Sequence, residues 1–150
     1  MVNLSILNLK VVKEKEINYD WADKKINSPE KVAEVAINVL ELHERAEESF
    51  YIFTLDVKNQ INGIFEVSRG SLYASIVHPR EIFKRALLQN AYGIILLHNH
   101  PSGDPTPSGE DIDITNRLIE AGDLLGIRVL DHIIVGDQSN YISFKQKTLM

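Results

Sequence analysis

Apolar and polar residues follow two different spacings along the chain, and together they predict helices packed on a sheet. Apolar residues recur every three or four positions in stretches that open at Ser28, His78 and Ser108, which indicates three amphipathic helices. Serine is a favoured N-cap, and the prolines that follow Ser28 and His78 suit the first helical turn. We expect the first helix to end near Arg45 and the third to stop at Gly126.

Other segments have the composition of strands. Residues 50–57 and 61–67 are rich in aromatic and β-branched side chains and flank a turn at 58–60, so they predict a hairpin. Residues 93–97 are fully apolar, as in a central strand covered on both faces. Two further strands are expected at residues 127–135 and 141–144. This order of elements predicts the α/β class (α+β), with a mixed β-sheet flanked by helices.

The first 27 residues carry the weakest pattern. Leu7, Leu9 and Val11 nearly alternate with polar residues, which indicates an edge strand, and a polar connector follows at 18–27. We therefore divide the chain into an N-terminal arm or edge strand, residues 1–27, and one domain over residues 28–150. The arm could pair with a neighbouring copy, so a homodimer is one expectation.

Composition narrows the classes of partner and of metal site. The formal net charge of −5 argues against unaided binding to nucleic acid or to an anionic membrane. No apolar run is long enough to span a bilayer, and the N-terminus does not read as a signal peptide, so we expect a cytoplasmic protein without a membrane partner. The chain has no cysteine, so any metal site must use histidine and carboxylate ligands.

A cluster of such ligands follows the apolar strand at 93–97. His98 and His100 point to the same face, because residues two apart on a strand do so at a spacing of roughly 6.6 Å. Asp111 falls in the first turn of the third helix, from which a carboxylate can face the strand end. Zinc (Zn2+) with three protein ligands keeps a fourth position for water, as catalytic sites do.

Two alternatives to this zinc site stay open. Ser108 and Asp111 have the spacing of a capping box, which is a purely structural motif. Manganese, iron or cobalt could also occupy the same three ligands. We expect one zinc ion per chain.

The segment 98–111 reads His-Asn-His-Pro-Ser-Gly-Asp-Pro-Thr-Pro-Ser-Gly-Glu-Asp. It resembles the JAMM (MPN+) metallopeptidase signature, in which His-x-His is followed by seven residues, Ser, two residues and Asp. Together with Gly70-Ser71-Leu72 and residues 77–81 and 130–136, it is similar to the RadC-like branch of that superfamily. The resemblance covers about residues 28–145. It implies the JAMM fold, akin to the cytidine deaminase fold, and hydrolysis of peptide or isopeptide bonds.

The resemblance also implies two catalytic residues. JAMM members supply a general base from the start of an earlier strand, and Glu48 occupies the matching position here. Glu47 is the alternative if the register shifts by one residue, and both could instead be solvated acids at a helix end. Glu66 and Glu81 are less suitable. The resemblance implies that Ser108 donates its hydroxyl to the developing oxyanion.

The remaining histidines have simpler interpretations. His132, beside Asp131, could support a metal ligand or contact substrate, or it could be a core histidine with satisfied hydrogen bonds. His43 and His78 are expected to be structural.

We therefore predict a zinc-dependent metallopeptidase or isopeptidase that acts on a peptide or protein substrate. Deaminase chemistry is not indicated, since it requires His-x-Glu and Pro-Cys-x-x-Cys motifs and the chain has no cysteine. The alternative is a DNA-repair-associated RadC-like protein, either a nuclease or an accessory factor. Longer RadC-like proteins carry an N-terminal helical region suggestive of DNA binding, for which 27 residues are too few. A non-catalytic interaction module is disfavoured by the complete ligand set.

Overall fold

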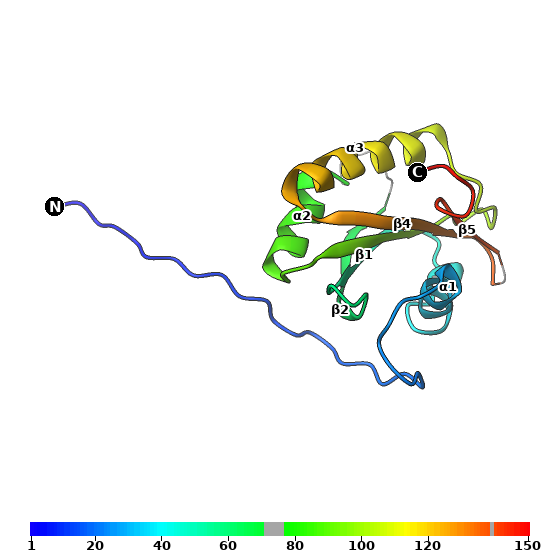
Figure 1. The fold of residues 1–150 in the computed structure, drawn as a ribbon, viewed down its shortest axis with the longest axis horizontal. Coiled ribbons are helices and arrows are strands. Elements are labelled where there is room, and N and C mark those ends of the chain that lie inside the picture. Colours follow the sequence, from blue (N-terminus) through cyan, green and yellow to red (C-terminus); the bar gives the residue numbers. More distant parts are fainter. Residues whose placement is uncertain (71–76, 139) are drawn as a thin grey trace.

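The structure, a computed structural model, describes residues 1–70, 77–138 and 140–150. Its strands form one mixed sheet in the order β2-β1-β3-β4-β5 (Figure 1). They are β1 (Ser49–Leu55), β2 (Ile61–Arg69), β3 (Gly93–Asn99), β4 (Arg128–Val135) and β5 (Tyr141–Ser143). Only β3 and β4 run parallel, and the other neighbours are antiparallel. The predicted mixed sheet and the β1–β2 hairpin are confirmed. Ser71 and Leu72 of the Gly-Ser-Leu motif lie outside the described residues.

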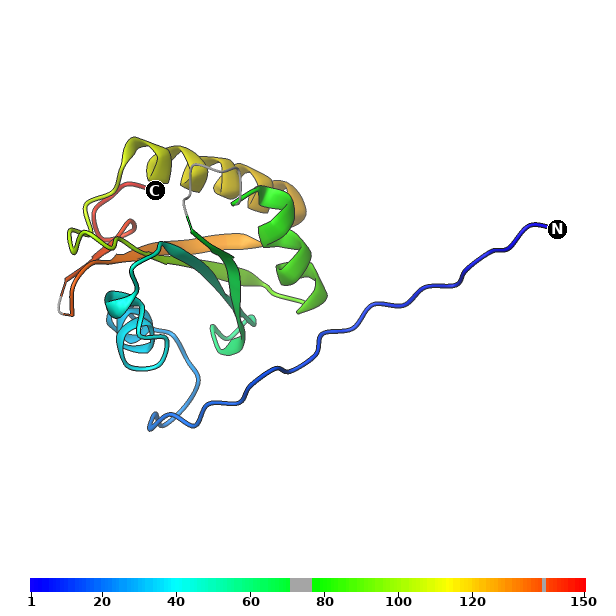
Figure 2. The same cartoon turned by 180° about the vertical axis from the view of Figure 1, so that it is seen from behind.

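The helices cover both faces of this sheet. α1 (Pro29–Asn38) lies on one face, and α2 (Pro79–Leu88) and α3 (Gly109–Leu125) lie on the other, as the two opposite views show (Figure 1, Figure 2). Gly126 ends α3 in the left-handed conformation, as predicted, with φ 73°. No helix in the described part of the chain has the length and apolar character needed to cross a membrane.

Each face of the sheet has its own buried core. β3 lies in the middle and is buried along its whole length, so the central strand predicted at 93–97 is confirmed. Leu97 belongs to the core beneath α1, and Leu96 belongs to the core beneath α2 and α3. Because side chains alternate along a strand, Asn99 falls on the α1 side of the sheet and His98 on the other.

The first helix is shorter than its apolar pattern predicted. α1 ends at Asn38, and a separate 3₁₀ helix follows at Leu42–Glu44. The break spans residues 39–41, and it includes Glu41, whose left-handed φ of 51° cannot occur within a continuous right-handed helix. Leu42 then enters the core from this second turn, which is why the apolar spacing continued past the helix. Ser28 occupies the N-cap position but makes no capping hydrogen bond through its side chain.

The edge strand predicted at Leu7, Leu9 and Val11 is wrong. Residues 1–20 have no regular secondary structure, and the arm runs away from the domain (Figure 2). Leu7 and Leu9 are 87% and 78% exposed. The physical reason is that a strand needs a partner to satisfy its backbone groups. In the described part of the arm, pairing with the sheet is limited to one bridge between Lys25 and Gln60, while Ile26 and Trp21 pack against the core beneath α1.

Candidate metal centre

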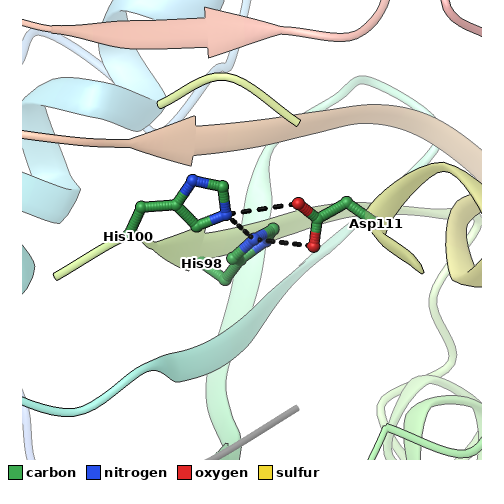
Figure 3. Close-up of side chains that lie close together, drawn as sticks. All are labelled: His98, His100 and Asp111. Carbon is green, nitrogen blue, oxygen red and sulfur yellow. Dashed lines mark hydrogen bonds and ion pairs between the residues drawn. The ribbon is translucent and has the colours of Figure 1, made fainter. Parts of the chain in front are cut away.

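Three side chains meet beyond the end of β3 (Figure 3). The Nε2 atoms of His98 and His100 are 3.1 Å apart, and each lies 3.2 Å from one carboxylate oxygen of Asp111. Ligand atoms around a tetrahedral zinc ion lie about 3.3 Å apart, because its bonds to nitrogen and oxygen are about 2.0–2.1 Å long. The spacing of this triad therefore fits a metal ion, and the three residues could hold one.

Local structure explains how Asp111 reaches the histidines. The Ser108 hydroxyl oxygen accepts from the Asp111 backbone N–H at 3.1 Å, and the Asp111 carboxylate accepts from the Ser108 N–H at 2.7 Å. This is a complete capping box, so the structural alternative is real and coexists with the triad. The cap orients the Asp111 carboxylate at the start of α3. The bond that Ser108 accepts leaves its own hydroxyl proton unused.

A chain of hydrogen bonds determines which nitrogen of His98 carries the proton. The Thr115 hydroxyl donates to the Asp111 carbonyl, which can only accept. Thr115 must therefore accept from His132 Nδ1–H at 2.6 Å. Burial lowers the pKa of His132 well below its ordinary value, so the ring is neutral and its Nε2 accepts from His98 Nδ1–H at 2.8 Å. The lone pair of His98 Nε2 is then free for the triad.

A backbone carbonyl orients His100 in the same way. The Asp104 carbonyl accepts from His100 Nδ1–H at 2.8 Å, which leaves the Nε2 lone pair directed into the triad. The loop that carries Asp104 packs closely on the end of β4. The His100 N–H donates to the Val135 carbonyl at 2.8 Å, and a Cβ at Gly136 would overlap the Gly103 carbonyl. Only glycine allows this approach, so Gly136 helps to place the acceptor for His100.

The triad has the electrostatics of a cation site. Burial raises the pKa of the Asp111 carboxyl. When the Nε2 atoms of His100 and His98 carry protons, the hydrogen bonds that they donate to Asp111 outweigh burial and hold this pKa well below its ordinary value. The hydrogen bond with Asp111 raises the pKa of His100. With both rings neutral, two imidazole lone pairs and a carboxylate face one another. That arrangement is favourable only when a positive charge lies between the three groups, either a proton or a metal ion.

An open cleft of about 210 Å³ lies over the triad. Its lining residues are Glu48, His100, Pro101, Ser102, Ser108, Glu110 and Asp111. Both residues that the resemblance implies as catalytic, Glu48 and Ser108, therefore share a cleft with two of the triad residues.

The strand register separates Glu48 from Glu47. Phe50 pairs with His98 in the β1–β3 ladder, and extending this register by two residues places Glu48 opposite His100. Glu48 lines the cleft, and its charge adds to the larger effect of Asp111 in raising the pKa of His100. Glu47 is exposed and is not among the residues that line the cleft. Geometry favours Glu48, and its catalytic role stays a prediction.

His132 and Asp131 have different roles. His132 is fully buried, and both of its ring nitrogens have hydrogen-bond partners, as expected for a core histidine. One of these partners is His98, so His132 also supports a residue of the triad. The Asp131 carboxylate accepts from the Ser143 hydroxyl at 2.6 Å and from the Lys145 N–H at 3.0 Å. Asp131 thereby ties the C-terminal segment to β4.

Four other histidine and glutamate residues with a possible role in the sequence do not line the cleft. The His78 ring accepts from the Arg80 backbone N–H at 3.0 Å and caps α2. Glu66 and Glu81 form ion pairs with basic side chains of their own elements. His43 lies in the 3₁₀ helix, with its Nε2 3.6 Å from a Glu44 carboxylate oxygen. These contacts fit the structural roles predicted for the two histidines.

Comparison with known proteins identifies the family. The family model of the RadC-like JAB domain matches residues 26–149. The chain belongs to the RadC-like JAB domain family. The predicted resemblance is thereby confirmed, and the His98–His100–Asp111 triad is a candidate metal site within a RadC-like JAB domain.

Several curated relatives are similar to this RadC-like chain over most of its length. A UPF0758 protein of Desulfitobacterium hafniense is 51% identical over 125 residues, which cover 83% of this chain and 54% of that protein. A UPF0758 protein of Caldanaerobacter subterraneus is 54% identical over 124 residues, which cover 81% of this chain and 51% of that protein. A UPF0758 protein of Methanosarcina acetivorans is 52% identical over 124 residues, which cover 83% of this chain and 53% of that protein. The chain spans about half the length of the curated relatives it matches.

For two residues of the RadC-like site, the sequence did not predict the supporting role that the structure shows. Thr115 lies four residues after Asp111 and so shares a helix face with it, a signal that could have pointed to this position. Asn99 hydrogen-bonds to the backbone of residues 47 and 49, far away in the sequence, and no local pattern reports such a contact.

We expect Thr115→Val to weaken zinc binding by this RadC-like domain about 10- to 100-fold. Without the hydroxyl, His132 Nδ1–H has no acceptor, and the ring proton moves to Nε2. His98 then keeps its own proton on Nε2, where it opposes metal binding. Zinc affinity is measured by competition with a chromogenic chelator. Thr115→Ser keeps the hydroxyl and should keep the affinity, so equal weakening in both variants would contradict the tautomer argument.

Proposed function

We propose that this domain is a zinc-dependent metallopeptidase or isopeptidase that hydrolyses an amide bond. One observation carries the proposal: three side chains that could hold a metal ion converge at an open cleft that also presents a carboxylate and a hydroxyl. Metal sites with three protein ligands keep a position for water, which is typical of catalytic zinc sites rather than structural ones.

The side chains around the cleft suit separate tasks in such a reaction. A metal ion held by His98, His100 and Asp111 would lower the pKa of water and polarise a carbonyl group. Glu48 accepts a proton from the attacking water and returns it to the nitrogen of the leaving amine. Ser108 donates its hydroxyl to the oxyanion that develops on the substrate carbonyl. The capping box supports this role, because it uses the Ser108 oxygen as an acceptor and leaves the proton available.

The charges of the cleft support an amide substrate over a phosphodiester. Glu48, Glu110 and Asp111 contribute carboxylates, and the described residues that line the cleft include no lysine or arginine. Proteins that bind DNA neutralise its phosphates with basic side chains, which are lacking at this position. The acidic net charge of the chain points the same way. A peptide segment, neutral or cationic, fits these surroundings better.

The proposal is tested with zinc-loaded protein and a proteome-derived peptide library, supplemented with a peptide joined to a lysine side chain through an isopeptide bond. Mass spectrometry should detect new peptide termini, or release of the isopeptide branch, and a chelator should suppress both. Supercoiled plasmid in a parallel reaction should stay intact. Zinc-loaded protein that cleaves neither kind of amide would overturn the proposal, and nicking of the plasmid would favour the DNA-associated alternative.

A further inference from the structure

Asn99 lies between the two histidines in sequence but has its side chain on the opposite face of the sheet. It is fully buried at the end of β3. Its Oδ1 accepts from the Ser49 N–H at 2.7 Å, and its Nδ2 donates to the Glu47 carbonyl at 3.1 Å. The two bonds hold the backbone immediately before and after Glu48.

These bonds replace the strand pairing at the point where it ends. In the β1–β3 ladder the last pair is Phe50 with His98, and the next position would join Ser49 to Asn99. From this position on, the Asn99 side chain makes the hydrogen bonds to the backbone of Ser49 and Glu47 in place of strand pairing. The other side of the segment is held as well, because the Gly70 N–H donates to the Glu48 carbonyl at 2.8 Å. The backbone of Glu48 is therefore fixed from both neighbouring strands.

The chemistry of the amide suits this task, and an apolar side chain does not. Leu97, two residues earlier on the same face, packs in the core beneath α1, so an aliphatic residue would suit the environment of Asn99. Only a side chain that carries both an acceptor and a donor can bind an N–H and a carbonyl two residues apart. Burial makes the pair of bonds specific, since a buried polar group without partners is unfavourable.

We infer that Asn99 is the positioning residue for Glu48, holding the backbone of residues 47–49 so that the Glu48 carboxylate faces the cleft while Glu47 does not. The inference rests on the proposed function, because it concerns the base in that reaction. It also links the metal ligands to the base, since His98, Asn99 and His100 are consecutive residues. The strand that directs two imidazoles to one face thus directs an amide to the other, where it sets the position of the proton acceptor.

The test compares Asn99→Leu with Asn99→Asp in zinc-loaded protein. Asn99→Leu removes both bonds, and we expect faster hydrogen exchange of the Ser49 amide by NMR. The kcat for the best library peptide should fall on the order of 100-fold, as expected for a misplaced catalytic group, with KM and bound zinc unchanged. Asn99→Asp keeps the acceptor for Ser49 but not the donor, so exchange at Ser49 should stay slow and kcat should fall less. If Asn99→Leu does not fold, the kcat of Asn99→Asp still tests the inference.

Thr54→Val is the matched control. Thr54 is a buried polar residue of β1 whose hydroxyl donates to Asn62 Oδ1 at 2.6 Å, and it lies toward the opposite end of the strand from Ser49. It should leave kcat unchanged. Unchanged kcat in both Asn99 variants, unchanged Ser49 exchange in Asn99→Leu, or an equal loss of kcat in Thr54→Val would each overturn the inference. A zinc-loaded wild type that cleaves no peptide overturns the proposed function instead, a result that is recognisable without any Asn99 variant.

Discussion

Asp111→Asn is expected to abolish metal binding. Wild-type protein should carry about one zinc ion per chain after loading, and the variant should carry close to none. The substitution preserves the shape of the side chain and an oxygen that can still accept from the Ser108 N–H, so the cap of α3 is retained. It removes the negative charge that faces the two imidazole lone pairs. Elemental analysis of purified, zinc-loaded protein gives the stoichiometry directly.

Asp113→Asn provides the control for this measurement. Asp113 is an exposed residue of the same helix, two positions further on, and the substitution makes the same change of charge. Its zinc content should equal that of the wild type. Full zinc occupancy in Asp111→Asn would remove Asp111 from the ligand set. A wild type that binds no zinc, manganese, iron or cobalt would reduce the signature to a cap and a loop, and the interaction-module alternative would then lead.

Glu48→Gln is expected to lower hydrolysis about 10²- to 10⁴-fold while leaving bound zinc unchanged. Glutamine has nearly the same size and can accept hydrogen bonds, but it cannot take a proton from water at neutral pH. Zinc should stay bound because Glu48 lines the cleft without being one of the three converging ligands. The rate is measured on the best peptide from the library, with zinc determined on the same sample.

Glu47→Gln is the matched variant for this test. It makes the same change one residue earlier, at a position that is exposed and is not among the cleft residues. Its rate should lie close to that of the wild type. If Glu47→Gln loses activity and Glu48→Gln keeps it, the register argument is wrong and the roles are exchanged. Loss of zinc from Glu48→Gln would instead make Glu48 a metal ligand.

The sequence predicted those features of the site that are local. His98 and His100 share a face because strand geometry repeats every two residues, whatever surrounds the strand. Ser108 and Asp111 form a capping box because the first turn of a helix brings these positions together. The central strand could be recognised because only a strand buried on both faces is apolar throughout. Local spacing was therefore sufficient to predict all three members of the triad.

Contacts between segments that are distant in sequence could not be predicted from local spacing. The arm around Leu7 has the alternation of a strand, but a strand also needs a partner, and the structure provides none for residues 1–20. The helix pattern after α1 continued to Arg45 because Leu42 faces the same core from a separate turn. In both cases the spacing of apolar residues reported which side chains are buried without reporting how the backbone reaches them.

The sequence by itself determined the family, the order of the central elements and the three residues that could hold a metal ion, since each depends on spacing within short segments of the chain. The tertiary structure decided the protonation pattern of His98 through Thr115 and His132, which come from α3 and β4. It also showed that Glu48, and not Glu47, lines the cleft, where the pairing of β1 with β3 and the bonds from Asn99 hold the backbone around it. Hydrogen bonds between segments far apart in sequence form only when the sheet brings them together, so no local pattern contains them.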